Sequence, residues 1–114
     1  MVTFETVRAL ALALPETIEG TSYGTPAFKV RGKFLARLRE EGILVVKVGH
    51  DAQEALIQMQ PEVYFITPHY AGYPAVLVRL AAVEADDLRD LLTEAWRLNA
   101  PKRLVASYAA TDSR

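Results

Sequence analysis

Apolar residues near the start of the chain recur every three or four positions, which is the spacing of one face of a helix. They are Phe4, Val7, Leu10, Ala11 and Leu14. Thr3 is suited to cap the start of this helix, and Pro15 predicts its end, because the residue before a proline disfavours helical geometry. We therefore predict a helix over residues 4–14, followed by a short polar strand from Thr17 to Tyr23.

The helical spacing gives way to strict alternation after a predicted turn at Gly24-Thr25-Pro26. Alternation predicts strands over residues 27–31, 33–39 and 43–48, and the segments between them are short enough to be tight turns. Strands joined in this way form an antiparallel meander with one apolar face and one mixed face. The apolar face would contain Phe28, Val30, Phe34, Ala36 and Leu38.

A second helix and two further extended segments follow the meander. Asp51 is suited to cap a helix that ends near Gln60, where Pro61 follows. Residues 63–66 and 75–80 are rich in apolar and β-branched side chains, and we expect both to be extended.

The last third of the chain is predicted to be helical. Acidic residues from Glu84 onward suit the start of a helix that ends near Asn99, with Trp96 on its apolar side. Pro101 fits the first turn of a final helix through Tyr108.

The order of these elements predicts an α+β fold, in which an antiparallel β-sheet carries helices packed on one face. With 114 residues, we expect a single domain over residues 1–110 and a flexible tail over residues 111–114. The chain contains no cysteine, which excludes disulfides, thiolate metal sites and cysteine nucleophiles. It shows neither a basic leader nor an apolar run of membrane length, so we expect a cytoplasmic protein that does not bind membranes.

Positive charge is concentrated in the predicted strands, although the whole chain has a net charge of −1. Residues 26–48 contain six basic and two acidic residues. Alternation places four of the basic residues on the face opposite the apolar one, and they are Lys29, Arg31, Lys33 and Arg37. Together with Lys47 they could neutralise phosphates. The alternative is that these cations only keep the strands solvated and prevent edge-to-edge association.

The loop from Phe65 to Pro74 gathers His69, Tyr70 and Tyr73, and Tyr23 precedes a similar Gly-Thr-Pro segment upstream. These side chains could recognise a ligand, and the tyrosines could stack on a ring or pin their loops to the domain.

His69 has the right chemistry for a catalyst, but residues 63–83 contain no carboxylate that could assist it. We therefore expect His69 to be a contact or scaffold residue. The second histidine, His50, is nineteen residues away, a spacing that predicts no metal site. No nucleophile elbow or phosphate loop is present, so we predict no catalysis and no cofactor.

Several of these segments together resemble one known family. The segments are Ala13-Leu14-Pro15 with Glu19-Gly20-Thr21, Tyr23-Gly24-Thr25-Pro26-Ala27-Phe28-Lys29-Val30, Gly32-Lys33-Phe34-Leu35-Ala36-Arg37, Thr67-Pro68-His69-Tyr70 with Gly72-Tyr73-Pro74, and Leu92-Thr93-Glu94-Ala95-Trp96-Arg97. Over nearly its whole length the chain resembles the MmcQ/YjbR family of small bacterial proteins. The resemblance implies a CyaY-like or "double wing" α+β domain, and the family is described as DNA-binding by analogy of fold.

The leading prediction is a non-enzymatic domain that binds nucleic acid, possessing a basic sheet face beside an aromatic loop surface. The residues predicted to meet phosphates are Lys29, Arg31, Lys33, Arg37 and Lys47, and those predicted to line the adjacent surface are Tyr23, His69, Tyr70, Tyr73 and Arg79. One alternative is a module that binds a small molecule or a peptide, which predicts a concave pocket near His69 and Tyr73. The other is a protein-interaction domain, as a monomer or a weak dimer.

Overall fold

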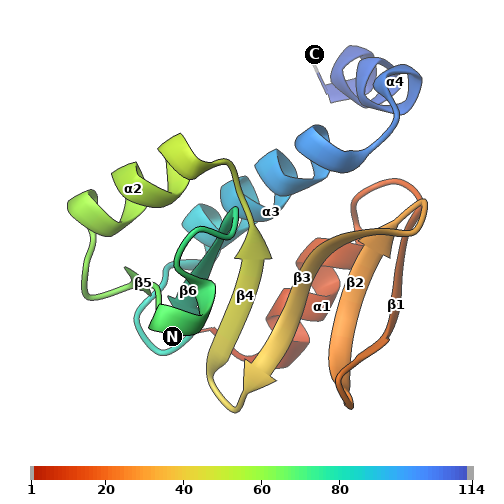
Figure 1. Cartoon of the computed structure of the whole chain (residues 1–114). Helices are drawn as coiled ribbons and strands as arrows, with labels where there is room; N and C mark the ends of the chain where they lie inside the picture. The colour runs from red at the N-terminus through yellow and green to blue at the C-terminus, as the bar shows by residue number, and fades with distance from the viewer. Residues whose placement is uncertain (1, 113–114) are drawn as a thin grey trace.

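Six antiparallel strands form one sheet in the computed structural model, which describes residues 2–112 of the chain and the side chains of residues 2–108. The strand order is β1-β2-β3-β4-β6-β5 (Figure 1). The strands are β1 (Thr17–Ser22), β2 (Thr25–Val30), β3 (Lys33–Glu40), β4 (Ile43–Lys47), β5 (Tyr64–Phe65) and β6 (Ala75–Arg79). The predicted α+β fold with an antiparallel sheet is confirmed.

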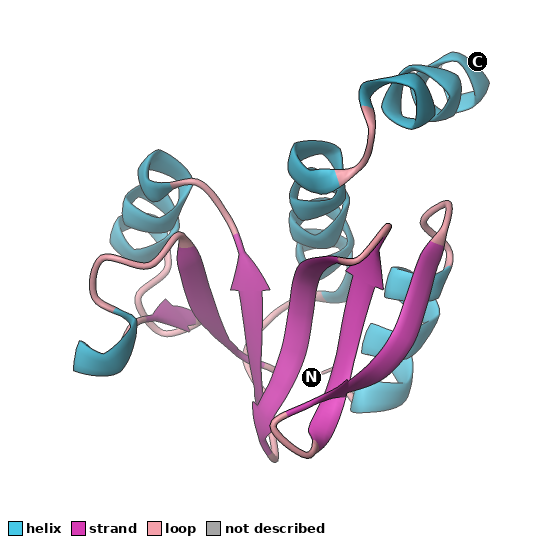
Figure 2. Cartoon of the chain, turned by 45° about the vertical axis from the view of Figure 1, so that its right-hand side comes forward, coloured by secondary structure: helices cyan, strands magenta, loops and turns pink. Residues whose placement is uncertain are grey.

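The helices are α1 (Phe4–Leu12), α2 (His50–Met59), α3 (Ala85–Asn99) and α4 (Lys102–Asp112). Helices α1, α2 and α3 lie on one face of this sheet, and α4 extends beyond the end of the sheet (Figure 2). As predicted, Thr3 caps α1, since its hydroxyl accepts from the backbone N–H of Thr6. The predicted cap of α2 is wrong. Gly49 occupies that position without a side-chain bond, and Asp51 lies in the first turn.

The ends of the terminal helices differ from the sequence prediction by a few residues. Helix α1 ends two residues before Leu14. Helix α4 continues to Asp112, so residues 111 and 112, predicted as a loose tail, are helical. Residue 1 of the predicted domain and residues 113–114 of the predicted tail lie outside the described residues.

Trp96 stands at the centre of the core between the helices and the sheet. Its side chain is fully buried, and its indole Nε1 donates a hydrogen bond of 2.9 Å to the carbonyl oxygen of Pro15. Tyr108 of α4 meets the indole edge-on, with ring centroids 4.9 Å apart. The prediction of Trp96 as a core residue is confirmed, and the single indole joins α3 to α4 and to the segment after α1.

A β-bulge in β3 changes which side chains face the helices. Phe28 of β2 pairs with Ala36, whereas Lys29 pairs with Phe34, so Leu35 is an extra residue in β3. Leu35 and Ala36 are both buried in the helix-side core. The prediction that Phe34 lies on the apolar face is therefore wrong, because the bulge moves Phe34 to the opposite face.

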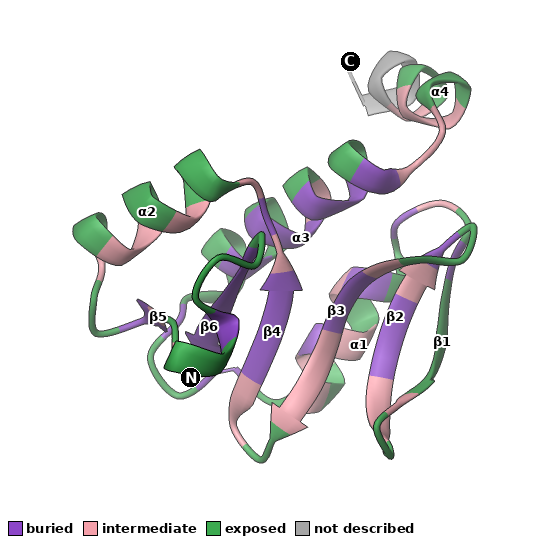
Figure 3. Ribbon diagram, viewed as in Figure 1, coloured by how far each residue is buried: buried purple, intermediate pink, exposed green. Residues whose placement is uncertain are grey.

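That opposite face, called the outer face below, has a small core of its own. Val45, Leu77, Ala75 and Tyr70 are buried there, and Phe34, Ile43 and Phe65 pack against them. A short 3-10 helix, η1 (Pro68–Tyr70), covers the β4–β6 part of the outer face (Figure 3). No described segment covers the β1–β3 part of the outer face, so a step separates the two parts (Figure 3).

Candidate functional site

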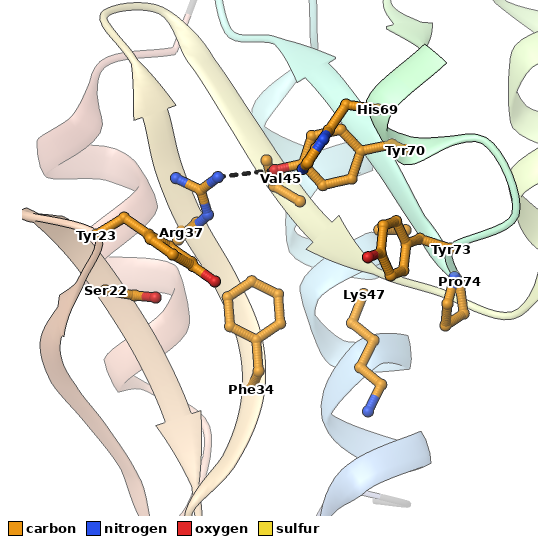
Figure 4. Close-up of a pocket in the computed structure, with 11 residues that line it drawn as sticks. Ser22, Tyr23, Phe34, Arg37, Val45, Lys47, His69, Tyr70, Tyr73 and Pro74 are labelled. Carbon is orange, nitrogen blue, oxygen red and sulfur yellow. Dashed lines mark hydrogen bonds between the residues drawn. The ribbon is translucent and has the colours of Figure 1, made fainter. Parts of the chain in front are cut away.

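A hollow of about 660 Å³ lies on the outer face, between the β1–β2 hairpin and the η1 loop (Figure 4). We call it the tyrosine hollow. Its lining residues are Ser22, Tyr23, Phe34, Arg37, Val45, Lys47, His69, Tyr70, Tyr73, Pro74 and Ala75. The prediction of a concave pocket near His69 and Tyr73 is therefore confirmed as a geometric feature.

Tyr23 forms one wall of the tyrosine hollow from the tip of a two-residue hairpin. Tyr23 and Gly24 have φ angles of 55° and 78°, the left-handed pair that a type I′ turn requires. The turn lies one to two residues earlier than the predicted Gly24-Thr25-Pro26. Its geometry projects the Tyr23 ring over the sheet, where 90% of the residue remains exposed. The exposed ring is available to a ligand.

The opposite wall is the η1 loop, which several hydrogen bonds hold in place. The backbone N–H of Tyr70 donates to the carbonyl of Thr67, and that of Tyr73 donates to the carbonyl of Tyr70. The Gln53 amide of α2 donates to the carbonyl oxygens of Tyr73 and Ala75, at 3.0 and 2.6 Å. Hydrogen bonds within the loop and from helix α2 therefore fix its position.

Three aromatic rings of this loop lie against one another. The ring centroid of Tyr70 is 5.0 Å from that of His69 and 6.0 Å from that of Tyr73. Tyr70 is buried and pins the loop to the sheet, whereas Tyr73 is 54% exposed and faces the hollow. Of the two roles that the sequence left open for the tyrosines, Tyr70 has the scaffold role and Tyr73 is placed for contact.

Arg37 links the two walls. Its Nη2 donates a hydrogen bond of 2.7 Å to the Tyr70 hydroxyl, and its Cζ lies 5.2 Å from the centroid of the Tyr23 ring. Within the described part of the chain, neither Arg37 nor Lys47 forms an ion pair, and no carboxylate lines the hollow. Two uncompensated cations near aromatic surface give this site a positive potential.

The predicted basic face is only partly assembled. Lys29 is paired with Phe34 and Arg37 with Val45, so both lie on the outer face as predicted. Lys33 is paired with Val30, a fully buried core residue, and therefore leaves the sheet on the helix side. Its predicted place on the basic face is wrong.

Arg31 is also absent from that face, because it occupies the β2–β3 turn with a φ of 51°. It forms an ion pair with Glu16 instead. The Arg31 guanidinium holds the pKa of the Glu16 carboxyl below its usual range. The sequence pattern could not distinguish this turn residue from a strand residue of the same face.

Arg79 lies at the far end of β6 and does not line the tyrosine hollow. Its Cζ stacks 4.1 Å from the centroid of the Phe65 ring, and its Nη1 is 3.3 Å from the carbonyl oxygen of Pro61. Both contacts direct the Arg79 guanidinium towards β5 and the segment before it, and away from the tyrosine hollow.

Phe34 is the lining residue that sequence reasoning assigned to the wrong place. The adjacent apolar pair Phe34-Leu35 interrupts the alternation of β3, which is the signal of a bulge. Ser22 and Val45 carried no signal of their own, because their role depends on the pairing of strands.

The described residues contain neither a cluster of metal ligands nor a helix that could span a membrane. Among the side chains described, no three His, Asp or Glu residues cluster closely enough to hold a metal ion. No helix within residues 2–112 is both long enough and apolar enough to cross a membrane.

The family is decided by a match that covers the whole sheet, α2 and nearly all of α3. The YjbR family model matches residues 12–98. The chain belongs to the YjbR family. The fold of this YjbR chain is similar to the crystal structure of Deinococcus radiodurans protein DR2400, which contains a domain of the DUF419 family model, with a TM-score of 0.74 and 26% sequence identity. The likeness covers 86% of this chain and 78% of the other.

The curated relatives are similar to this chain in sequence, but their names state no function. The YjbR chain is 61% identical over 56 residues to the uncharacterized protein Mb2600 of Mycobacterium bovis and, equally, to the uncharacterized protein Rv2570 of Mycobacterium tuberculosis. The matched segment is 49% of this chain and 43% of each relative.

Proposed function

We propose that this YjbR domain is a binding module and not an enzyme, and that the tyrosine hollow takes up an anion that carries a flat ring. The observation that supports this most directly is the position of Arg37, whose guanidinium is held between the Tyr70 hydroxyl and the Tyr23 ring without a carboxylate partner in the described chain. A guanidinium fixed in this way retains free N–H donors for a phosphate, sulfate or carboxylate group.

The aromatic residues supply the second half of the recognition. Tyr23 and Tyr73 are exposed on opposite sides of the hollow, and Phe34 and Val45 contribute apolar surface between them. A flat ring can stack on an exposed tyrosine while its anionic group reaches Arg37 and Lys47. The volume of about 660 Å³ lies within the range of small-molecule sites.

Nothing in the hollow supports proton transfer by an assisted histidine. His69 has no hydrogen bond to a carboxylate in the described residues, and Ser22 is the only aliphatic hydroxyl of the lining. Binding without reaction is therefore the simpler proposal.

Nucleic acid is the second candidate, because the cations of the outer face extend beyond the hollow. Lys29 lies on the same face as Arg37, in the neighbouring strand. A single strand could stack a base between Tyr23 and Tyr73 and place its phosphates near Lys29, Arg37 and Lys47.

A titration followed by NMR amide shifts tests the main proposal. The probes are phenyl phosphate, inorganic phosphate and phenol, each added to the full chain at low salt. We expect phenyl phosphate to bind tighter than either part alone, with shifts centred on Tyr23, Arg37 and Tyr73. Arg37→Gln should weaken the binding of phenyl phosphate by about tenfold to a hundredfold, since a charged hydrogen bond contributes about 1.5 to 3 kcal/mol.

Arg79→Gln is the matched control, because it removes a cation of the same sheet outside the hollow. Its affinity for phenyl phosphate should equal that of the unaltered protein. Equal weakening by both variants, or equal affinity for phenyl phosphate and inorganic phosphate, contradicts the proposal. A single-stranded thymidine oligonucleotide and a duplex in the same assay test the second candidate.

A further inference from the structure

A second concavity lies on the helix side, between α2 and α3, and has a volume of about 590 Å³. We call it the acidic groove. Its apolar wall includes Ala55, Leu56 and Met59 of α2, and Leu91 and Leu98 of α3. Met59 is 73% exposed and Leu98 is 63% exposed, so both helices present large apolar side chains to solvent at the groove.

Negative charge surrounds this apolar surface. Among the described side chains, four carboxylates line the groove and no basic residue does. They are Asp51, Asp87, Asp90 and Glu94. Arg97 approaches Glu94 to 3.7 Å and Arg89 approaches Asp90 to 4.0 Å, but both pairs are exposed, and neither arginine lines the groove. Asp51 and Asp87 form no ion pair in the described chain, so the groove keeps a net negative charge.

Tyr64 adds a hydrogen-bonding group to the lining of the groove. It lines the groove and is only 2% exposed, yet its hydroxyl forms no hydrogen bond within the described residues. Burial, with a smaller contribution from Asp87, raises the pKa of this hydroxyl. The hydroxyl oxygen is not among the buried polar atoms that lack a partner, so it reaches the groove and can form a hydrogen bond with a ligand group there.

We propose that the acidic groove is a docking site for a basic amphipathic helix of a partner protein. Two neighbouring helices form a trough that suits the apolar stripe of a third, and an exposed methionine adapts to varied side chains. Lysine or arginine residues beside that stripe would meet the four carboxylates.

The basic helix of a second copy is a poor occupant. Helix α4 begins with Lys102 and Arg103, but its apolar residues Leu104, Val105 and Tyr108 already pack against the core of their own chain. A basic helix of a different protein, whose apolar stripe is free, is therefore the better occupant. This proposal does not depend on what the tyrosine hollow binds.

A pair of model peptides tests the proposal on the full chain. Each has about 16 residues with leucines at helical spacing, and the remaining positions are lysine in one peptide and glutamate in the other. Fluorescence anisotropy should show saturable binding of the lysine peptide only. NMR amide shifts should centre on Ala55 and Leu98. Absence of binding at low salt, or shifts centred on the outer face, overturns the proposal.

Charge-reversal variants make the test specific to the groove. The double variant Asp90→Lys, Glu94→Lys should weaken the binding of the lysine peptide by about tenfold, because two attractive charge interactions at the groove become repulsive. Asp86→Lys is the matched control, since Asp86 lies on the same helix without lining the groove, and the affinity should change less than about twofold. Equal weakening by the control overturns the proposal.

A pair of leucine variants distinguishes docking on the apolar wall from charge attraction alone. Leu98→Gln should weaken the peptide several-fold, whereas Leu12→Gln, an exposed leucine of α1, should not. Measuring the mass of the protein in solution tests whether a second copy of the chain occupies the groove. A dimer that Leu98→Gln converts to a monomer would show that a second copy fills the groove, and would overturn the partner helix.

Discussion

The guanidinium of Arg37 donates a hydrogen bond of 2.7 Å to the hydroxyl of Tyr70, and thereby joins strand β3 to the η1 loop across 33 residues of sequence. Arg37 also lies beneath the Tyr23 ring, so one side chain holds both walls of the tyrosine hollow. This relationship makes the shape of the site and the orientation of its arginine mutually dependent.

Removing the Tyr70 hydroxyl should therefore affect stability as well as binding. In Tyr70→Phe we expect the free energy of unfolding to fall by about 1 kcal/mol, because a partly buried hydrogen bond is lost. We also expect a several-fold weaker affinity for phenyl phosphate, because Arg37 loses its orientation. Urea denaturation measures the first effect. Tyr73→Phe removes a hydroxyl without a hydrogen bond in the described residues, and it should leave stability unchanged.

The two lysines near the β2–β3 turn should behave differently towards nucleic acid. Lys29 lies on the outer face, whereas Lys33 leaves the sheet on the helix side. If an oligonucleotide binds the outer face, Lys29→Gln should reduce the affinity and lower the salt slope by about one, and Lys33→Gln should do neither. Titrations at two salt concentrations measure both. An equal loss in the two variants would place the nucleic acid elsewhere.

Tyr23 offers a way to separate binding from folding. Its φ of 55° is costly for a bulky side chain, and asparagine tolerates this conformation better. Tyr23→Asn should therefore keep the free energy of unfolding within about 0.5 kcal/mol, because relief of strain offsets the lost contact with Arg37. The affinity for phenyl phosphate should fall several-fold. A variant that binds normally would mean that the ring makes no contact with the ligand.

Glu19 should make stability depend on pH. Arg8 donates to both carboxylate oxygens of Glu19, at 2.8 and 3.1 Å, and lowers the pKa of that carboxyl from its ordinary value of 4.5. A lowered pKa stabilises the fold above the ordinary value, and this contribution is lost as the pH falls through the folded-state pKa.

Thermal denaturation between about pH 6 and 3 measures this effect. Glu19→Gln should be less stable than the unaltered protein at pH 6, and the difference should shrink towards pH 3. Glu62→Gln is the control, because the Glu62 carboxylate forms no ion pair in the described chain. If the difference in stability between Glu19→Gln and the unaltered protein is constant with pH, the charge of Glu19 in its pair with Arg8 does not stabilise the fold.

Much of the fold could be predicted because local patterns are physically tied to local structure. Helical spacing located α1 and α3, alternation located the meander, and Thr3 was identified as the cap of α1. The burial of Trp96 followed from its place on an apolar helical stripe. The family resemblance, drawn from short segments, agrees with the match to the YjbR family model.

The sequence by itself therefore determined the fold class, most elements and the residue types of the candidate site. Only the tertiary structure decided which of these residues meet. The bulge at Leu35 moved Phe34 to the outer face, and strand pairing separated Lys29 from Lys33. The physical reason is that a strand has two faces. One inserted residue reverses the assignment, and only hydrogen bonding to a neighbouring strand fixes it. The contact of Arg37 with Tyr23 and Tyr70 depends on that register, so no local pattern could have revealed it.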